Sequence, residues 1–270
     1  MDQCGVQCIE ADLMDRHSLH EPLDMVDVVY NLAFPTPGSG DYTKFNAVAL
    51  NNLLEEANEH GAKVFVHLSC LDVYGFGGAI GPNSTPRPID EYQKGKLAAE
   101  QFVTDFGTNH PDMKVRVVRS ARAVGPRDKG ITLPLLKMVE DGRVVLPPGS
   151  TNVISLSHPK DIAQSMLRAA TYEGQWEEFL VKSFDASIES LSKKLSEATG
   201  KKADVKSSGL LSGKTLIRQY AADQIKAGRT IGEQAFWKKI SYVPSYTMEK
   251  TVKEVSEWYR KEPWATKELA

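Results

Sequence analysis

Val26-Asp-Val-Val-Tyr-Asn-Leu-Ala33 is the stretch that decides the fold class, because its run of apolar residues is almost unbroken. A strand of this kind is covered on both faces, which is typical of a parallel sheet packed between helices. Similar short runs occur at Val6 to Glu10, Lys63 to Leu68 and Val115 to Arg119. We therefore predict an α/β fold in which these strands alternate with helices.

Stretches with apolar residues at helical spacing lie between and after these strands. Tyr42 to His60 is followed by Gly61, a residue type that commonly ends a helix in the left-handed conformation. Glu91 to Phe106 forms a second predicted helix. A third begins at Pro159, where the first helical turn needs no amide donor.

The chain changes character after about residue 175, where short strands and helices rich in Lys, Ser and Glu follow one another. The predicted elements include helices at Ser187 to Thr199 and Thr247 to Tyr259. No linker rich in Pro, Gly or Ser precedes them. We expect residues 1–175, joined by later segments, to form the main domain, and residues 176–270 to form a small α/β lobe packed over the sheet.

Composition narrows the class of function. The 270 residues carry 33 Lys and Arg against 35 Asp and Glu, a formal net charge of −2. No basic stripe indicates nucleic-acid binding, so a small polar ligand is the expected partner.

No apolar run approaches the roughly 20 residues of a membrane helix, and the start does not resemble a signal peptide, so we expect a cytoplasmic protein. Cys4, Cys8 and Cys70 match neither a disulfide framework nor a zinc signature, and we expect reduced thiols and no metal.

Phe65 to Gly75 is the most informative stretch for function, because an apolar strand runs directly into small polar residues and glycine. Ligands of open parallel sheets bind outside the carboxyl ends of the strands, which is where Ser69 and Cys70 are expected. An ordinary strand-to-loop turn explains the same residues equally well.

Tyr92-Gln-Lys-Gly-Lys96 places a tyrosine and a lysine four residues apart at the start of a predicted helix, hence on one face. An ammonium within about 4–6 Å lowers the pKa of a phenol and lets it act as an acid or base. Tyr246 and Lys250 repeat the spacing, but no strand end precedes them, and we interpret them as a surface feature of the last helix.

With these residues the chain resembles the extended short-chain dehydrogenase/reductase superfamily, and within it the NAD-dependent epimerase/dehydratase family. The resemblance covers nearly the whole chain, and its motifs occur in the family's order. The matching segments are Asp12-Leu13, Asn31 to Ala33, Asn46 with Asn52 to Ala57, Ser69 to Gly75, Tyr92 to Glu100, Arg119 to Asp128, and Ser155 to Ala163.

The resemblance implies hydride chemistry with NAD or NADP on a nucleotide sugar or a related hydroxyl or carbonyl substrate. It implies that Tyr92 is the acid/base and that Lys96 lowers its pKa and holds the nicotinamide ribose. The family's third catalytic residue, a Ser or Thr, is Cys70 here, a weaker donor that could instead be a small buried thiol filling space. Ser69, one residue earlier, would point to the opposite face of the strand.

The resemblance also implies positions that contact the cofactor or the substrate. The expected cofactor residues are Asp12, Leu13, Leu32, Ala33, Asn46, Tyr92, Lys96 and Ser120. Arg122 and Arg127 could bind a diphosphate, although a salt bridge to a nearby carboxylate is at least as good an explanation for either. Epimerase, dehydratase and reductase activities all remain open.

One family feature is missing from the sequence. The glycine-rich turn that holds the cofactor pyrophosphate would precede Val6. We interpret the glycine-rich segments Phe34 to Gly40 and Gly75 to Gly81 as rims of the active site instead. The expected fold is therefore a Rossmann-like, doubly wound parallel sheet missing its first two strands, with a small C-terminal α/β substrate lobe.

Three explanations for the missing turn compete. The simplest explanation is that the sequence begins at an internal methionine of a longer protein. Alternatively, a separate chain could supply the missing unit, or the chain has given up NAD binding. The last corresponds to a rival function, a cofactor-free relative that acts as a binding or scaffolding protein. The resemblance further implies dimerisation through the helices at 42–60 and 91–106.

Overall fold

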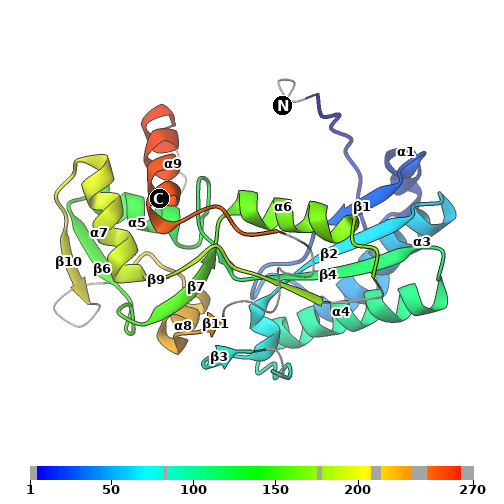
Figure 1. Cartoon of the computed structure of the whole chain (residues 1–270), viewed down its shortest axis with the longest axis horizontal. Helices are drawn as coiled ribbons and strands as arrows, with labels where there is room; N and C mark the ends of the chain where they lie inside the picture. Colours follow the sequence, from blue (N-terminus) through cyan, green and yellow to red (C-terminus); the bar gives the residue numbers. More distant parts are fainter. Residues whose placement is uncertain (1–4, 82–83, 175–177, 208–213, 233–241, 263–270) are drawn as a thin grey trace. The chain divides into compact units, whose positions relative to one another are not determined.

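The computed structural model describes residues 5–81, 84–174, 178–207, 214–232 and 242–262 (Figure 1). These residues form two compact units. The first contains the described parts of Met1–Ser69, Pro88–Val118 and Ala169–Phe179, and the second those of Cys70–Arg87, Arg119–Arg168 and Leu180–Ala270. Both units are assembled from segments far apart in the sequence, and the expected division at residue 175 stays a prediction.

A parallel sheet is the framework of the first unit, as the unbroken apolar runs predict. Its strands lie in the order β1 (Val28–Asn31), β2 (Val64–Cys70), β4 (Lys114–Ser120) and β8 (Glu178–Val181). β1 and β2 pair in parallel from Val28 opposite Val64 to Asn31 opposite His67. The carboxyl ends of β1 and β2 therefore lie at the same edge of the sheet.

The predicted strand at Val6 to Glu10 is wrong. These residues belong to no strand and are exposed, and the exposed fraction of Val6 is 60%. An apolar run becomes a strand only where a neighbouring strand pairs with its backbone groups, and no described segment pairs with this one.

Two helical stretches of the first unit match the predictions closely. The helical elements are η2 (Arg16–Leu19), α1 (His20–Leu23), α2 (Tyr42–Lys44), the π-helical turn η3 (Phe45–Leu50), α3 (Asn51–Glu59) and α4 (Glu91–Asn109). The Asp41 side chain caps α2 at the amide of Lys44, and Asp90 caps α4 at the amide of Gln93. Gly61 follows α3 with φ +79°, so the predicted stop is confirmed.

The core of the first unit joins these helices to the sheet. Leu54 of α3, Phe65 of β2 and Val103 of α4 have no exposed surface and belong to one hydrophobic cluster. Burial of side chains of this size stabilises the fold by about 1.5–3 kcal/mol each. The helices that carry candidate site residues are therefore fixed against the sheet.

Short sheets and five helices form the described part of the second unit. β7 (Val153–Ser157) pairs in parallel with β5 (Arg122–Ala123) and antiparallel with β9 (Phe184–Ser187), while β6 (Arg143–Leu146) pairs with β10 (Asp204–Ser207) and β3 (Ala79–Ile80) with β11 (Thr230–Ile231). The helices are α5 (Thr132–Glu140), α6 (Pro159–Ala170), α7 (Ile188–Thr199), α8 (Gln219–Ala227) and α9 (Met248–Lys261), with a 3-10 turn, η4 (Leu71–Tyr74).

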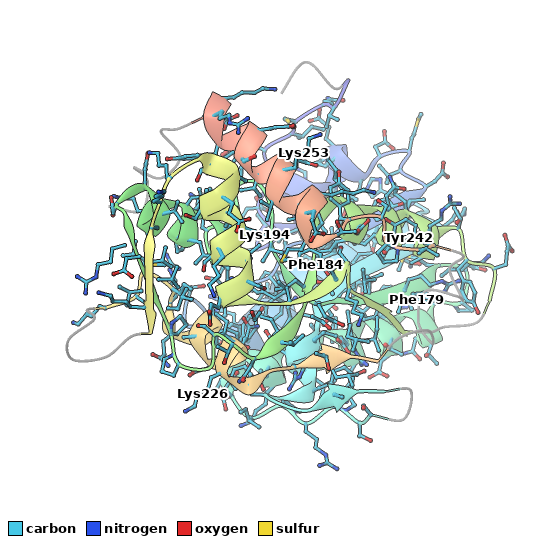
Figure 2. The ribbon with its side chains drawn as sticks, turned by 60° about the vertical axis from the view of Figure 1, so that its left-hand side comes forward. Phe179, Phe184, Lys194, Lys226, Tyr242 and Lys253 are labelled. Atoms are coloured by element: carbon cyan, nitrogen blue, oxygen red, sulfur yellow. The ribbon has the colours of Figure 1, made fainter. Side chains whose placement is uncertain are left out.

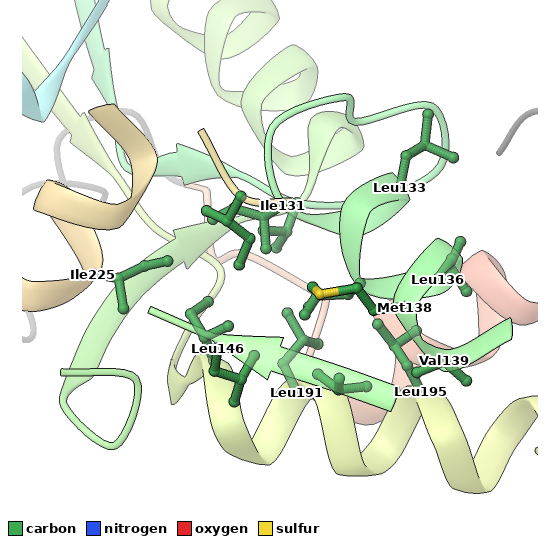
Figure 3. Close-up of a cluster of buried hydrophobic side chains, with 14 of the residues drawn as sticks. Ile131, Leu133, Leu136, Met138, Val139, Leu146, Leu191, Leu195 and Ile225 are labelled. Atoms are coloured by element: carbon green, nitrogen blue, oxygen red, sulfur yellow. The ribbon is translucent and has the colours of Figure 1, made fainter. Parts of the chain in front are cut away.

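A separate hydrophobic core holds the second unit. Leu136 of α5, Leu146 of β6 and Leu191 of α7 are buried together, with Ile225 of α8 in the same cluster (Figure 3). α7 and α9 lie side by side and carry Lys194 and Lys253 (Figure 2). No helix in the described part of the chain has the length and hydrophobicity needed to cross a bilayer.

Candidate functional site

The carboxyl ends of β1 and β2 carry the first polar side chains of the site. Asn31, the last residue of β1, is buried, and its Nδ2 lies 3.0 Å from Nδ1 of His67 on β2. Its Oδ1 accepts a hydrogen bond from the amide of Ala33 at 3.0 Å. This turns the chain away from the sheet and leaves Leu32 and Ala33 exposed at its edge.

Lys96 lies on α4 with only 6% of its surface exposed. Its Nζ donates to the Leu68 carbonyl oxygen at 3.1 Å and lies 4.2 Å from the centre of the Phe34 ring. A desolvated ammonium gains from both contacts, since a carbonyl and an aromatic face each present negative charge. Burial, followed by the nearby Lys96 charge, lowers the pKa of His67 well below its ordinary value. His67 is therefore neutral at physiological pH.

Tyr92, one turn before Lys96, lies in an aromatic cluster at the same place. Its ring is 5.9 Å from Phe34 and 5.7 Å from Tyr42, in edge-to-face geometry, while Phe34 and Tyr42 stack at 5.8 Å. Phe34 thus contacts both members of the predicted pair. Sequence reasoning missed it as a site residue, although it opens a segment interpreted as a rim.

Gly95 and Asn46 fix the start of α4. A Cβ on Gly95 would lie 2.5 Å from Cβ of Tyr42, so only glycine allows this approach. The Gly95 carbonyl accepts a hydrogen bond from Nδ2 of Asn46 at 2.9 Å. Asn46 is 7% exposed, and its amide ties η3 to the helix that carries Tyr92 and Lys96.

The other predicted residues of the first unit lie in three places. Ser69 is 2% exposed near the end of β2. Asp12 is exposed, and its carboxylate accepts from the amide of Met14 at 2.9 Å. The Leu13 carbonyl accepts from Nδ2 of Asn52 on α3 at 2.9 Å, so this backbone is anchored to a helix.

The second unit contains Cys70, Ser120, Arg122 and Arg127. Cys70 is partly exposed and Ser120 is buried. Arg122 lies 4.0 Å from Oδ1 of Asp128, and Arg127 lies 3.3 Å from Oε1 of Glu262. Both arginines therefore face carboxylates, and they line different cavities of this unit rather than one diphosphate site.

Arg122 lines a small cleft with a volume of about 30 Å³, together with four further polar residues, Asp72, Ser155, Gln224 and Arg229. Asp72 accepts two hydrogen bonds of 2.8 Å from Nε2 of Gln224. Arg229 donates to the carbonyls of Leu71 at 2.7 Å and Gly77 at 3.2 Å, and burial lowers its pKa. Gln224 and Arg229 follow Asp72 by about 150 positions, and no local pattern in the sequence marks them.

Arg127 lines an open groove of about 820 Å³ beside α9, together with His158, Tyr246 and Lys250. The Tyr246 hydroxyl donates to Glu254 at 2.8 Å, while Lys250 donates to the Ser245 carbonyl. Burial and then Glu254 raise the pKa of Tyr246. This second tyrosine-lysine spacing therefore lacks the electrostatics of an acid/base pair.

Comparisons with known proteins agree with this architecture. The model of the NAD dependent epimerase/dehydratase family matches residues 2–180. An undecaprenol-linked N-acetylglucosamine 4-epimerase of Escherichia coli O157:H7 is 24% identical over 159 residues, 57% of this chain and 48% of the relative. A dTDP-glucose 4,6-dehydratase of Streptomyces antibioticus is 25% identical over 174 residues, 59% of this chain and 51% of the relative. The chain thus spans about half the length of these two relatives.

Solved structures share the fold. The crystal structure of dTDP-glucose 4,6-dehydratase from Bacillus anthracis in complex with NAD has a TM-score of 0.78 and 18% identity, covering 100% of this chain and 84% of that one. This similarity confirms the predicted Rossmann-like fold class.

Proposed function

Because the chain belongs to the NAD-dependent epimerase/dehydratase family, we propose that it performs hydride chemistry on a nucleotide sugar or a related hydroxyl or carbonyl compound. In this proposal Tyr92 exchanges a proton with the substrate and Lys96 stabilises the phenolate. The observation that carries it is the position of the Lys96 ammonium, which lies against the Leu68 carbonyl one helical turn from Tyr92. This is the edge of a parallel sheet where ligands bind.

The residues at this edge fit the nicotinamide-ribose end of NAD or NADP. Leu32 and Ala33 are exposed directly beyond β1, and the Lys96 ammonium is a donor suited to ribose hydroxyls. When bound, the cofactor accepts or returns a hydride. Residues that would hold the pyrophosphate through a glycine-rich turn are not among those that the structure describes.

In the same proposal, the cleft of the second unit contributes one candidate substrate-binding residue, Arg122. Arg122 offers a guanidinium suited to a phosphate group, while the volume of about 30 Å³ leaves no room in this cleft for a sugar or a base. Arg127, whose ion pair with Glu262 lies in the open groove, is left out of this role.

The test measures turnover with NAD or NADP and the sugar nucleotides UDP-glucose and dTDP-glucose. We expect Tyr92→Phe to lower kcat by about 10²–10⁴-fold with little change in cofactor affinity, since only the proton-transfer group is lost. Lys96→Met should lower kcat and should also weaken cofactor binding. Tyr246→Phe, the matched control, should retain activity, and full turnover by Tyr92→Phe would disprove the assignment.

The Phe34 ring lies over the Lys96 ammonium, the group that would contact the ribose in the proposal above. This contact favours a second candidate, a cofactor-free protein that uses the fold for binding. Cys70 in place of the family's Ser or Thr points the same way. Calorimetric titration of the chain with NAD and NADP separates the two candidates. Micromolar binding that Lys96→Met weakens supports the enzyme and contradicts the second candidate.

A further inference from the structure

Two of the chain's six histidines lie beside one buried carboxylate of the first unit, and a third packs on one of them, on the side of the sheet where the strands begin. Nε2 of His20 lies 3.1 Å from Oε2 of Glu56, and Nε2 of His60 lies 3.5 Å from the same oxygen. The His17 ring packs edge-to-face on His20 at 4.9 Å.

The cluster is separate from the candidate active site. His20 begins α1, which leads into β1, and His60 ends α3, which leads into β2. Ser69 lies five residues beyond Val64, the first residue of β2, which is roughly 17 Å of strand. The residues around Glu56 therefore serve a role that the proposed proton transfer does not use.

Glu56 is built into the fold rather than lying on the surface. Its side chain is 1% exposed, and one carboxylate oxygen, Oε1, contacts Nε of Arg16. The other oxygen, Oε2, has no hydrogen bond of normal geometry from any described residue. A buried carboxylate oxygen without a donor is costly, so a cation between it and the two imidazoles would compensate that cost.

The two distances from the histidine nitrogens to the carboxylate oxygen suit a tetrahedral metal ion. Zinc binds His nitrogen at about 2.0–2.1 Å and carboxylate oxygen at about 2.0–2.2 Å, which places two ligand atoms roughly 3.3–3.5 Å apart. The separations of 3.1 and 3.5 Å are close to this value, and all three ligand atoms lie within 4.8 Å of one another. A histidine and carboxylate set is also one that zinc prefers.

Neighbouring charges would support the ligands. Oδ1 of Asp24 lies 3.9 Å from Nδ1 of His60, the nitrogen that faces away from Glu56. Carboxylates in this position orient metal-binding imidazoles. Arg16 would hold Glu56 to one metal-facing oxygen, and its charge would moderate the affinity.

We propose that His20, Glu56 and His60 bind Zn²⁺ and that the ion fastens α1 to the end of α3. Water completes the coordination. Because Glu56 and His60 lie on one helix and His20 precedes them by 36 residues or more, the ion would bridge two segments that meet only through the fold.

The test is calorimetric titration of the full, untagged 270-residue chain with Zn²⁺ after chelator treatment. We expect one site in the parent chain and an affinity at least tenfold weaker in His20→Ala and in His60→Ala. His110→Gln is the matched control, since His110 packs on Phe106 elsewhere in this unit, and it should bind like the parent. His20 is exposed, so its replacement should leave the fold intact, which circular dichroism checks.

Two further measurements exclude other sources of binding. A variant with Ser at Cys4, Cys8 and Cys70 should keep the site, and Co²⁺ should give the visible absorption of a tetrahedral complex in it. Saturating Zn²⁺ should raise the unfolding temperature of the parent by roughly 5 °C but not that of His20→Ala. An affinity equal to that of the parent in both histidine variants, loss of binding in the serine variant, or no binding by the parent would overturn the proposal.

Discussion

Asp161→Asn tests whether a buried carboxylate organises the second unit. Asp161 has no exposed surface. Oδ1 accepts from the amide of Ser245 at 3.0 Å and from the Tyr242 hydroxyl, and Oδ2 accepts from the Ser183 hydroxyl at 2.5 Å and the amide of Tyr246 at 3.1 Å. One carboxylate thus connects α6, the segment after β8 and the segment before α9, where Tyr242 lies (Figure 2).

An asparagine can replace only one of these two oxygens. Its amide nitrogen would face either Ser245 or Tyr246, whose backbone N–H cannot turn around to accept. Losing a hydrogen bond to a charged acceptor costs about 1.5–3 kcal/mol, and an unsatisfied buried donor costs about 1–3 kcal/mol. We expect Asp161→Asn to lower the free energy of unfolding by about 3 kcal/mol at pH 7.

The loss should depend on pH in a defined direction. Burial raises the pKa of Asp161, but the hydrogen bonds from Ser183, Tyr242 and the two backbone amides outweigh it, so the net pKa lies below the ordinary 3.8. A depressed folded-state pKa gives stability that is complete above the unfolded pKa and is lost as pH falls through the folded value. The difference between parent and variant should therefore persist at pH 5 and shrink below about pH 3.8.

Urea unfolding followed by circular dichroism, from pH 7 down to the lowest pH at which the native state persists, measures this difference. Asp112→Asn, an exposed carboxylate, is the matched control and should stay within about 0.5 kcal/mol of the parent. A loss below 1 kcal/mol at pH 7, or a difference that does not shrink in acid, would refute the reasoning.

The remaining predictions concern the first unit. Gly95→Ala should destabilise it by about 1–2 kcal/mol in urea unfolding, because the overlap with Tyr42 outweighs the gain in helix propensity; a more stable variant would contradict this packing. Phe34→Leu keeps an apolar side chain but removes the ring over Lys96, so it should shift the pH profile of turnover, and an unchanged profile would show that the ring contact is irrelevant to proton transfer. Gly61→Ala should cost about 1 kcal/mol by the same unfolding measurement, because an L residue is strained at φ +79°, and an unchanged midpoint would refute that.

The sequence predicts the parallel sheet and its helices well because their signals are local. Unbroken apolar runs and helical spacing reflect burial on nearby elements, and they place β1, β2, β4 and α4 within a few residues of the observed bounds. Val6 to Glu10 fails because strand formation depends on a partner that local composition does not report. The π-helical turn at Phe45–Leu50 is also invisible in the spacing of apolar residues.

Some residues of the candidate site can be predicted from local sequence patterns, and others come together only through folding. Tyr92 and Lys96 follow from spacing on one helix, and the structure places them beside Phe34, whose role depends on how the chain turns after β1. Gln224 and Arg229 reach the cleft of Asp72 only through folding of the second unit. The histidine cluster is similar, since His20 reaches Glu56, 36 positions later in the sequence, only through the fold.

The π-helical turn at Phe45–Leu50 sets the rotational phase of everything that precedes it. If the same residues formed a regular α-helix instead, with no residue removed, its first turns would be rotated by about 100° relative to α3. Asn46 would then point away from the Gly95 carbonyl, and the Tyr42 side chain would no longer pack against Gly95 on α4. A change that only regularises this turn, and leaves every polar group of the site in the sequence, would in this way remove the packing and the hydrogen bond that hold the start of α4, where Tyr92 lies.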